Sequence, residues 1–389
     1  MKKVFVSALA FDEGKSGLAD YTVSVVREFA KDNQVDLLIY PSDAEIFPFK
    51  SENIRFRLVP EWLKPPFLSC VWHLWFLPIV LHAKRYEAIL FPAGHRRVVS
   101  HFPPQSVITF HDLTPYYVPQ RYNRRRMFYF KYVIPHYLLR APVIMAISEN
   151  TKNDLIRHYN LPPEKITVNY NGYNPEILKT DITETELRAK FKIERPYLFY
   201  NARIEHPVKN HIHLIRAFEL LPEEMRAQYD LVFCGQDSSG CEVVYDYIKE
   251  SPVSENIHFL GEVRPPWLGA LYKYALIYVF PSLHEGFGIP LLEAMAAGLP
   301  VVCSNRSALP EIGGDAVVTF DPEVHADIAV KIISVLNNPE LRERMSQRGK
   351  QRAKAFSWSN HVERIMALAA ESKKRQLGYS FKDRTILQP

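Results

Sequence analysis

Short apolar segments alternate with stretches of helical periodicity along most of the chain, and this rhythm predicts the fold. In the first half, the strand candidates are residues 3–6, 35–40, 88–91, 106–110, 143–147 and 166–169. In the second half, they are residues 197–200, 231–234, 257–260, 277–280, 301–304 and 317–320. Near-continuous apolar strands separated by helices are typical of parallel sheets covered on both faces. The pattern therefore predicts an α/β protein with two Rossmann-like domains.

The boundary between these domains falls in a polar stretch that follows Pro175. Within it, the run that starts at Thr183 is a capping-box pattern, which opens a new helix. We therefore expect the chain to divide into four parts: an N-terminal domain over 1–176, a linker over 177–194, a C-terminal domain over 195–356 and a final segment over 357–389. Ligands of open α/β sheets bind beyond the carboxyl ends of the strands, so two facing domains would enclose a cleft.

Composition narrows the class without fixing the function. The chain has 389 residues, 47% hydrophobic and 23% charged, which are the fractions of an ordinary globular protein. Its four cysteines form no C-x-x-C pair, so we expect reduced thiols and a cytoplasmic location. The apolar run at the N-terminus is too short for a signal peptide and predicts a first strand. The longest apolar stretch, residues 67–81, is too short to span a bilayer and predicts a buried helix or one that leans into a membrane surface.

The most informative motif starts at His284 and reads His-Glu-Gly-Phe-Gly-Ile-Pro-Leu-Leu-Glu-Ala-Met-Ala-Ala-Gly-Leu-Pro-Val-Val. Gly286 and Gly288 let a ligand approach the backbone, and the proline that follows is preorganised for the start of a helix. We expect this helix to hold Glu293 in its first turn, to end at Gly298 and to direct free N–H groups at a ligand. That chemistry predicts an anion site suited to phosphate, with a buried glycine-bounded helix as the alternative.

The two glutamates of this motif do not suit a glycosidase. A retaining glycosidase needs its two carboxyl groups about 5 Å apart. Eight helical residues would separate Glu285 from Glu293 by about 12 Å. One glutamate facing the sugar end of a nucleotide sugar and the other facing its ribose is a better interpretation.

The spacing of these glutamates closely resembles the signature of family 4 retaining glycosyltransferases, which have the GT-B fold. Further landmarks of the family occur in the right order along almost the whole chain, so chance resemblance is improbable. They are Ser16-Gly17-Leu18-Ala19-Asp20-Tyr21, Phe110-His111-Asp112-Leu113, Ala146-Ile147-Ser148-Glu149-Asn150-Thr151, Tyr170-Asn171-Gly172, Asn201-Ala202-Arg203-Ile204-Glu205 with Lys209-Asn210-His211, and Phe356-Ser357-Trp358. The resemblance implies a GT-B protein, with two Rossmann-like domains facing across a cleft and a final helix that crosses back onto the first domain.

The resemblance also implies roles in binding the sugar donor. Arg203 and Lys209 would hold the diphosphate and neutralise the leaving nucleotide, Glu285 would contact sugar hydroxyls, and Glu293 would accept from the ribose. His111 would lie near the sugar's 6-hydroxyl or the reacting centre. Glu285, His111, Arg203 and Lys209 form the expected catalytic set. The other expected donor contacts are Gly17, Val263, Leu268, Gly286, Phe287, Gly288 and Ile289.

Each of these residues also has a purely structural interpretation. Arg203 and Lys209 are otherwise surface cations in a loop after a strand. His111 is otherwise a cap at a strand end, and Gly17 a glycine that opens a helix.

For the acceptor side, the expected residues are Asp112, Ser148, Glu149, Arg124 and Arg125. Ser148 and Glu149 begin a helix after a strand, so they contact the acceptor or serve only as a helix cap and a first-turn acid. Arg124 and Arg125 belong to a stretch in which basic and aromatic residues alternate, from Arg121 to Arg140. Such a stretch suits contact with anionic lipid head groups or with nucleic acid, and a solvated helix with an aromatic core side is the alternative.

No metal ligand set is readable. The chain contains no Asp-x-Asp, which counts against the metal-dependent GT-A class, and the His211-x-His213 pair has no carboxylate or cysteine cluster beside it. We therefore expect no metal and no cofactor, with Arg203, Lys209 and a helix N-terminus stabilising the leaving charge.

These observations predict a retaining, metal-independent hexosyltransferase of bacterial-type surface polysaccharide or glycolipid assembly. Its expected partners are a nucleotide-sugar donor and a carbohydrate or lipid-linked acceptor, without nucleic acid. An anionic membrane surface is a further expected partner, which would place the protein at the inner face of the cell membrane. The competing classes are a nucleotide-sugar epimerase or a phosphorylase of the same fold, and a non-catalytic membrane-surface assembly protein.

Overall fold

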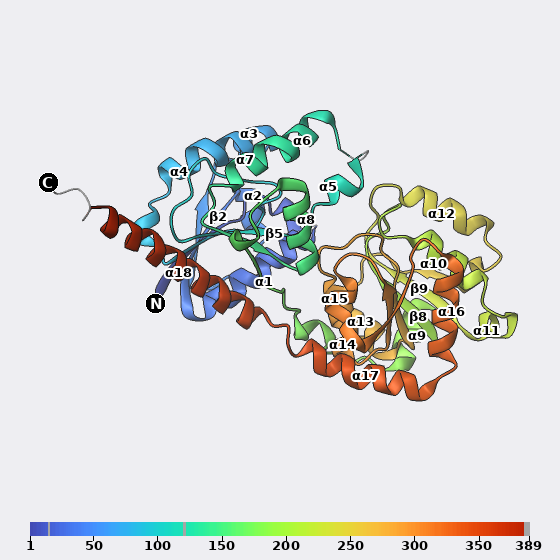
Figure 1. Cartoon of the computed structure of the whole chain (residues 1–389). Coiled ribbons are helices and arrows are strands. Elements are labelled where there is room, and N and C mark those ends of the chain that lie inside the picture. The colour runs from blue at the N-terminus through green and yellow to red at the C-terminus, as the bar shows by residue number, and fades with distance from the viewer. Residues whose placement is uncertain (15, 120–121, 385–389) are drawn as a thin grey trace. The chain divides into compact units, whose positions relative to one another are not determined.

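The computed structural model describes residues 1–14, 16–119 and 122–384, which form two compact units. Unit 1 comprises Met1–Gly172 and Ser357–Pro389, and unit 2 comprises Tyr173–Phe356. Each unit is built around one parallel sheet with helices packed on it (Figure 1).

Unit 1 has a seven-stranded parallel sheet in the order β3-β2-β1-β4-β5-β6-β7. Its strands are β1 Lys2–Ser7, β2 Asn33–Ile39, β3 Ile54–Leu58, β4 Ala88–Phe91, β5 Ser106–Phe110, β6 Val143–Ala146 and β7 Ile166–Val168. Its helices are α1 Gly17–Asp32, α2 Pro41–Glu45, α3 Pro66–Val71, α4 Leu77–Val80, α5 Thr114–Tyr117, α6 Arg124–Phe128, α7 Ile134–Leu138, α8 Glu149–Tyr159 and α18 Trp358–Arg384. β4 and β5 are buried at every position, as their apolar sequences predict.

Unit 2 repeats this topology with six parallel strands in the order β10-β9-β8-β11-β12-β13. They are β8 Tyr197–Asn201, β9 Asp230–Cys234, β10 Ile257–Phe259, β11 Ile277–Phe280, β12 Val301–Ser304 and β13 Val317–Phe320. The helices are α9 Glu184–Phe191, α10 His211–Glu219, α11 Glu223–Gln228, α12 Cys241–Glu250, α13 Trp267–Tyr274, α14 Ile289–Ala297, α15 Leu309–Gly313, α16 His325–Leu336 and α17 Pro339–Ala353.

The edge strand β3 is absent from the sequence-based prediction. Its sequence Ile-Arg-Phe-Arg-Leu alternates apolar and basic residues, whereas the predicted strands were recognised as continuous apolar runs. An edge strand with one solvated side has this alternation, so β3 does not show the continuous apolar run that marks the other strands.

Residues 177–194, expected to be a linker, are instead part of unit 2. The helix α9 begins at Thr183 with both bonds of the capping box, since Thr183 N donates to Glu186 Oε2 (2.8 Å) and Thr183 Oγ1 accepts from Glu186 N (3.3 Å). Leu187 is fully buried, and the Lys190 ammonium lies 4.6 Å from the Trp267 ring centre of α13. The segment is ordered because its apolar face is covered by α13.

The final helix α18 packs on α1, β4 and β5 of unit 1. Its His361 is buried, with Nδ1 2.8 Å from the Tyr170 carbonyl and Nε2 2.9 Å from the Tyr21 hydroxyl. Because a carbonyl only accepts, Nδ1 carries the proton and Nε2 accepts from Tyr21. The chain returns to unit 1 beside Gly172, where a Cβ would lie 2.3 Å from the Trp358 nitrogen, so only glycine fits there.

Two helical segments of unit 1 contain a π turn just before a proline. α3 continues through Trp72–Phe76 into α4, and α6 continues through Tyr129–Val133 into α7. In the first, Pro78 cannot donate to the carbonyl of Leu74, four residues earlier. Ser100 N donates a hydrogen bond to the Leu74 carbonyl instead, at 2.8 Å, and so connects this helix to the loop after β4.

Within residues 1–14, 16–119 and 122–384, no helix combines the length and the apolar character that crossing a bilayer requires.

Candidate functional site

The expected donor residues of unit 2 lie where the strand order of its sheet reverses. β8 and β11 are neighbours, and the chain proceeds outward from β8 to β9 and β10 on one side of the sheet and outward from β11 to β12 and β13 on the other. Loops leaving such a pair separate above the carboxyl edge of the sheet and leave room for a ligand. The loop after β8 carries Arg203 and Lys209, and the loop after β11 carries Glu285 to Gly288.

Lys209 and Glu285 form an ion pair. Lys209 Nζ donates to Glu285 Oε1 at 2.6 Å, with side chains only 16% and 14% exposed. Asn210, at φ 58°, fixes the end of the Lys209 loop, because its Nδ2 donates to the carbonyls of Pro281 (3.0 Å) and Pro322 (2.8 Å). The two loops are therefore joined both by a charge pair and by neutral hydrogen bonds.

Arg203 is paired separately from Lys209. Its Nη2 lies 3.1 Å from Glu205 Oε2, and its side chain is 46% exposed while that of Glu205 is 2% exposed. The buried carboxylate anchors one side of the guanidinium and leaves the other side accessible. This arrangement suits a guanidinium group that binds an anion. The Arg203–Glu205 contact itself lies within one loop.

Helix α14 begins where the sequence motif places it, after Gly288 at φ +98°. A Cβ on Gly288 would lie 2.7 Å from Leu309 Cδ2, so glycine is required for both conformation and space. Ile289 is the first helical residue, and Phe287 is buried with its ring 6.0 Å from that of Phe356. Phe287 thus has a core side chain, and only its backbone is suited to a ligand contact.

Glu293 is not in the first turn of α14, contrary to expectation, because it is the fifth residue of the helix. It is buried and accepts from the Tyr272 hydroxyl at 2.8 Å, and Tyr272 in turn accepts from Asn201 Nδ2 at 3.1 Å. Burial, and next Glu293, raise the pKa of Tyr272. Sequence analysis did not identify Tyr272, since nothing local to α13 marks it as a partner of a residue on α14.

Val263 and Leu268, two of the expected donor contacts, lie in a segment with an exposed part and a buried part. Gly261 is exposed at φ +64°, and Val263 is half-buried beside Cys234, toward which its backbone directs a hydrogen bond. Leu268 is buried in the first turn of α13. Val263 is therefore accessible to a ligand, and Leu268 mainly packs.

In unit 1, His111 directly follows β5. Its Nε2 lies 2.7 Å from the Pro92 carbonyl, so Nε2 carries the proton and Nδ1 is left as an acceptor. Burial lowers the pKa of His111 to about 4, so the ring is neutral near pH 7. The ring stands edge-on to Tyr21 at 4.5 Å and to His95 at 5.6 Å.

The other acceptor-side residues near this strand end have structural contacts. Asp112 Oδ1 accepts from Thr114 N at 3.0 Å. Ser148 is fully buried and caps α8, accepting from Thr151 N at 3.0 Å, and Glu149 is the exposed first-turn acid. For Ser148 the helix-cap interpretation fits better than an acceptor contact, because its hydroxyl is buried.

Gly17 is the first residue of α1, after the N-cap Ser16. A Cβ at Gly17 would meet nothing within 4 Å, so packing does not explain the glycine. The preceding loop has left-handed backbone at Asp12, Glu13 and Gly14, with φ of 48°, 59° and 78°. The surrounding structure must hold such a loop in place.

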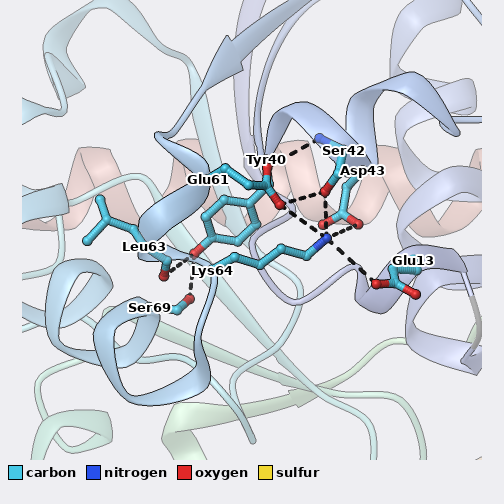
Figure 2. A network of polar contacts seen from close by, with 8 residues as sticks. All are labelled: Glu13, Tyr40, Ser42, Asp43, Glu61, Leu63, Lys64 and Ser69. Atoms are coloured by element: carbon cyan, nitrogen blue, oxygen red, sulfur yellow. Dashed lines mark hydrogen bonds and ion pairs between the residues drawn. The ribbon is translucent and has the colours of Figure 1, made fainter.

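Two cations that sequence analysis missed restrain this loop. Arg96 Nη1 donates to Asp12 Oδ2 at 2.8 Å. Lys64 Nζ lies 3.9 Å from Glu13 Oε1 and 3.2 Å from the buried Asp43, as Figure 2 shows. These contacts join residues far apart in sequence, so no local pattern could have predicted them.

The remaining predicted residues, Arg124 and Arg125, are exposed at the start of α6. Arg121, which opens the predicted basic stretch, lies outside the described residues. Among the residues that the structure describes, no group of three or more histidines, cysteines or carboxylates is placed to hold a metal ion.

Comparison with known proteins agrees with this geometry. Residues 183–352 match the family described as Glycosyl transferases group 1, and residues 15–177 match Glycosyltransferase Family 4. The chain is 32% identical over 269 residues to O-antigen chain mannosyltransferase B of Escherichia coli, covering 69% of this chain and 70% of that one. It is 28% identical over 257 residues to O-antigen chain mannosyltransferase RfbU of Salmonella typhimurium, covering 64% and 68%.

Among solved structures, the chain resembles HepE of Anabaena in complex with UDP and glucose. The TM-score is 0.73 at 16% identity, with 95% of this chain and all of the other covered. This likeness establishes the GT-B fold. The fold and the matched families together define a glycosyltransferase. The chain belongs to glycosyltransferase family 4.

Proposed function

We propose that the protein transfers a mannosyl residue from a nucleotide diphosphate sugar to an acceptor hydroxyl, with retention of configuration, during surface polysaccharide or glycolipid assembly. The names of the two bacterial relatives support mannose and the O-antigen context. The Anabaena structure with UDP and glucose supports a nucleotide-sugar donor. The observation that carries the proposal is the Lys209–Glu285 pair, joined at 2.6 Å beside the N-terminus of α14.

This pair fits a donor better than a structural role alone. A cation and the positive end of the dipole of a nine-residue helix converge where a diphosphate would bring negative charge. When the phosphate binds Lys209, Glu285 is released to accept from sugar hydroxyls. Arg203 adds a half-exposed guanidinium to the same loop, so charge on the leaving nucleotide meets fixed cations.

Glu293 is proposed to hold the ribose. A buried carboxylate with one oxygen fixed by Tyr272 keeps its orientation when a ribose hydroxyl donates to it. Gly286 to Gly288 would present backbone N–H groups to sugar and phosphate, and Val263 would contact the base.

For the reaction we propose attack on the face from which the nucleotide leaves, with the departing phosphate oxygen taking the acceptor's proton. His111 is neutral near pH 7 and holds its Nε2 proton on the Pro92 carbonyl, so it is suited to accept at Nδ1 and not to act as an acid. Its role is then to orient a sugar hydroxyl. Gly17 would leave room for donor and acceptor at the start of α1.

We also propose that no metal takes part. Lys209, Arg203 and the helix N-terminus supply the positive charge that a metal would otherwise bring to the diphosphate.

A lipid-linked acceptor and contact with an anionic membrane are the remaining parts of the proposal. The helical segments α3–α4 and α6–α7 lie side by side (Figure 1), and the ring centres of Trp75 and Tyr137 are 6.0 Å apart. Their exposed apolar side chains include Phe67 76%, Leu68 38%, Trp75 52%, Phe76 53%, Ile79 77%, Val80 55%, Phe128 60% and Tyr132 62%. Residues 62–86 and 113–148 contain no acidic residue, and Arg124, Arg125, Lys131 and Arg140 are exposed. Apolar side chains with a basic surround suit an anionic bilayer surface.

A donor panel tests the enzymatic proposal. The protein is incubated with UDP-, GDP-, ADP- and dTDP-sugars and mixed acceptors, and the anomeric configuration of the product is read by NMR. We expect one nucleotide mannose to be used, with configuration retained, and Lys209→Met to slow transfer about 100-fold. The exposed Lys354 of unit 2 provides the control, since Lys354→Met should leave the rate unchanged. An inverted product would overturn retention, and a donor epimerised without an acceptor would favour the epimerase class.

Liposome flotation tests the membrane proposal. Each basic residue near an anionic surface contributes about 1 kcal/mol, and salt screens the attraction. We expect flotation with anionic vesicles at low salt and its loss in an Arg124→Gln, Arg125→Gln variant, while Arg55→Gln on β3 has no effect. Absence of flotation at low salt would contradict the membrane proposal and support the interpretation of the α6–α7 segment as a solvated helix.

A further inference from the structure

The sheet of unit 1 has its own point of strand-order reversal, between β1 and β4. The equivalent point of unit 2, between β8 and β11, holds Lys209 and Glu285. In unit 1 the loop after β1 carries Asp12, and the loop after β4 carries His95, Arg96 and Arg97. Ligands of open parallel sheets bind at such points, so the side chains there need an explanation beyond packing.

Three arginines gather at this point. Arg96 and Arg97 are adjacent in the loop after β4, and Arg126 lies on α6. Tyr129, three residues after Arg126, donates its hydroxyl to the Arg96 carbonyl at 3.4 Å. This bond ties the helical segment that carries Arg126 to the loop of Arg96 and Arg97. Burial, and after it the charges of Arg96 and Arg97, lower the pKa of Arg126.

The cluster carries more positive charge than its paired carboxylates balance. Asp12 pairs with Arg96 at 2.8 Å. Arg97 instead donates to neutral groups, Ser69 Oγ at 3.2 Å and the Arg96 carbonyl at 3.0 Å. Arg126 lies over the Tyr122 ring, 4.8 Å from its centre. In the part of the chain that the structure describes, neither Arg97 nor Arg126 has a carboxylate partner.

Neutral contacts hold the cluster against this repulsion. Ser69 joins Arg97 to the Tyr40 hydroxyl, which donates to Ser69 Oγ at 2.7 Å (Figure 2). Two further hydrogen bonds fix the loop after β4. The buried His73 Nδ1 lies 3.1 Å from the Val98 carbonyl, and Ser100 N donates to the Leu74 carbonyl at 2.8 Å. Like charges are thus kept together by the fold, as in sites built for an anion.

Two buried polar atoms at this point have no hydrogen-bond partner in the structure. They are His95 Nδ1 and Arg96 Nε. His95 is 9% exposed, and its ring is 5.6 Å from that of His111. The Arg96 side chain is 29% exposed, so it is accessible from solvent. Buried polar atoms without partners are rare in folded proteins, and Arg96 Nε, which can only donate, suits a ligand oxygen.

We propose that Arg96, Arg97 and Arg126, with His95, bind a phosphate or diphosphate group of the acceptor. Guanidinium forks match phosphate oxygens in geometry and remain charged at all physiological pH values. The inference rests on the proposed transferase function, because it assigns the anion to the acceptor and the Lys209 site to the donor.

The position of the cluster favours a lipid-linked phosphate over a soluble one. Arg97 is bonded to α3, and Arg126 lies on α6, which are the segments that expose Phe67 and Phe128. An acceptor whose phosphate joins a sugar to an apolar chain could place each part on a matching surface. The sugar would then lie toward His111.

Matched acceptors test the proposal in the full-length protein. One is an oligosaccharide on a short alkyl diphosphate, the second carries a neutral alkyl group, and the third is a sugar phosphate without an alkyl chain. We expect Arg126→Gln and Arg97→Gln each to raise KM at least tenfold for the diphosphate acceptor and to leave KM for the neutral acceptor and the donor unchanged. Arg126→Lys should restore part of the loss, and Arg55→Gln should have no effect.

A binding measurement separates this inference from the transferase proposal. Calorimetry with the alkyl diphosphate, at saturating nucleoside diphosphate to fill the donor site, should show weaker binding to Arg126→Gln even if no acceptor is turned over. Equal binding of the sugar phosphate without an alkyl chain would support the anion site and assign it to a soluble acceptor. Unchanged KM and unchanged binding in both variants would overturn the inference and leave the donor site untouched.

Discussion

Breaking the Lys209–Glu285 pair should destabilise unit 2 by an amount that the structure allows us to bound. At 2.6 Å and an effective dielectric constant of about 20, the gross attraction is at most about 6 kcal/mol. Desolvation of two side chains that are only 16% and 14% exposed offsets part of this. We therefore expect a loss of about 2–3 kcal/mol when either partner alone is replaced by a neutral residue, because the other charge is left buried.

The measurement is a double-mutant cycle by calorimetric unfolding without ligand. For a domain of this size each kcal/mol shifts Tm by about 2–4 °C, so Lys209→Met and Glu285→Gln should each lower Tm of unit 2 by about 5–10 °C. The double variant should recover much of this loss. The exposed Lys249–Asp246 pair, 72% exposed on both sides at 2.8 Å, is the control and should show coupling within about 0.5 kcal/mol.

Strictly additive losses in the Lys209/Glu285 cycle would refute the reasoning, because they would mean that neither charge depends on the other. Single variants with unchanged Tm would refute it equally. The cycle uses no substrate, so its outcome is independent of the donor proposal.

Four further predictions concern the site and the fold. Tyr272→Phe should weaken donor binding about tenfold, since Glu293 loses the hydroxyl that orients it, and a donor KM equal to that of the parent would contradict this. Gly17→Ala should leave Tm unchanged, because its Cβ would meet nothing within 4 Å, yet slow transfer if donor and acceptor occupy that space. Burial lowers the pKa of His361 to about 4, so the unfolded chain binds more protons below its ordinary pKa of about 6.5 and unit 1 should lose stability as pH falls through this window. His361→Gln should remove only the share of His361 in that pH dependence of Tm, because burial also lowers the pKa of His73 to about 3 and that of His111 to about 4. Activity should survive exhaustive chelation, and a loss restored by magnesium or manganese would disprove the metal-free proposal.

Much of the fold was readable from the sequence because parallel strands buried on both faces are continuous apolar runs. The predicted strands and the helix after Gly288 follow from such local signals. β3 was not predicted, because its alternating sequence Ile-Arg-Phe-Arg-Leu has the period of a half-solvated edge strand and is not a continuous apolar run. The prediction of a linker over residues 177–194 was wrong, because a capping box identifies the start of a helix but does not show that another helix will cover its apolar face.

The sequence by itself determined the family, the two-sheet architecture and the position of the glycine-bounded helix that faces the proposed donor. These depend on neighbours in sequence, where propensity, periodicity and motif spacing act. Only the tertiary structure decided that Lys209 pairs with Glu285 and that Tyr272 holds Glu293. It alone brought the helical segment that carries Arg126 to Arg96 at the reversal point of the first sheet, through the bond from Tyr129 to the Arg96 carbonyl. Such contacts join residues far apart along the chain, and which of many possible partners meet is set by how the helices pack on the sheet.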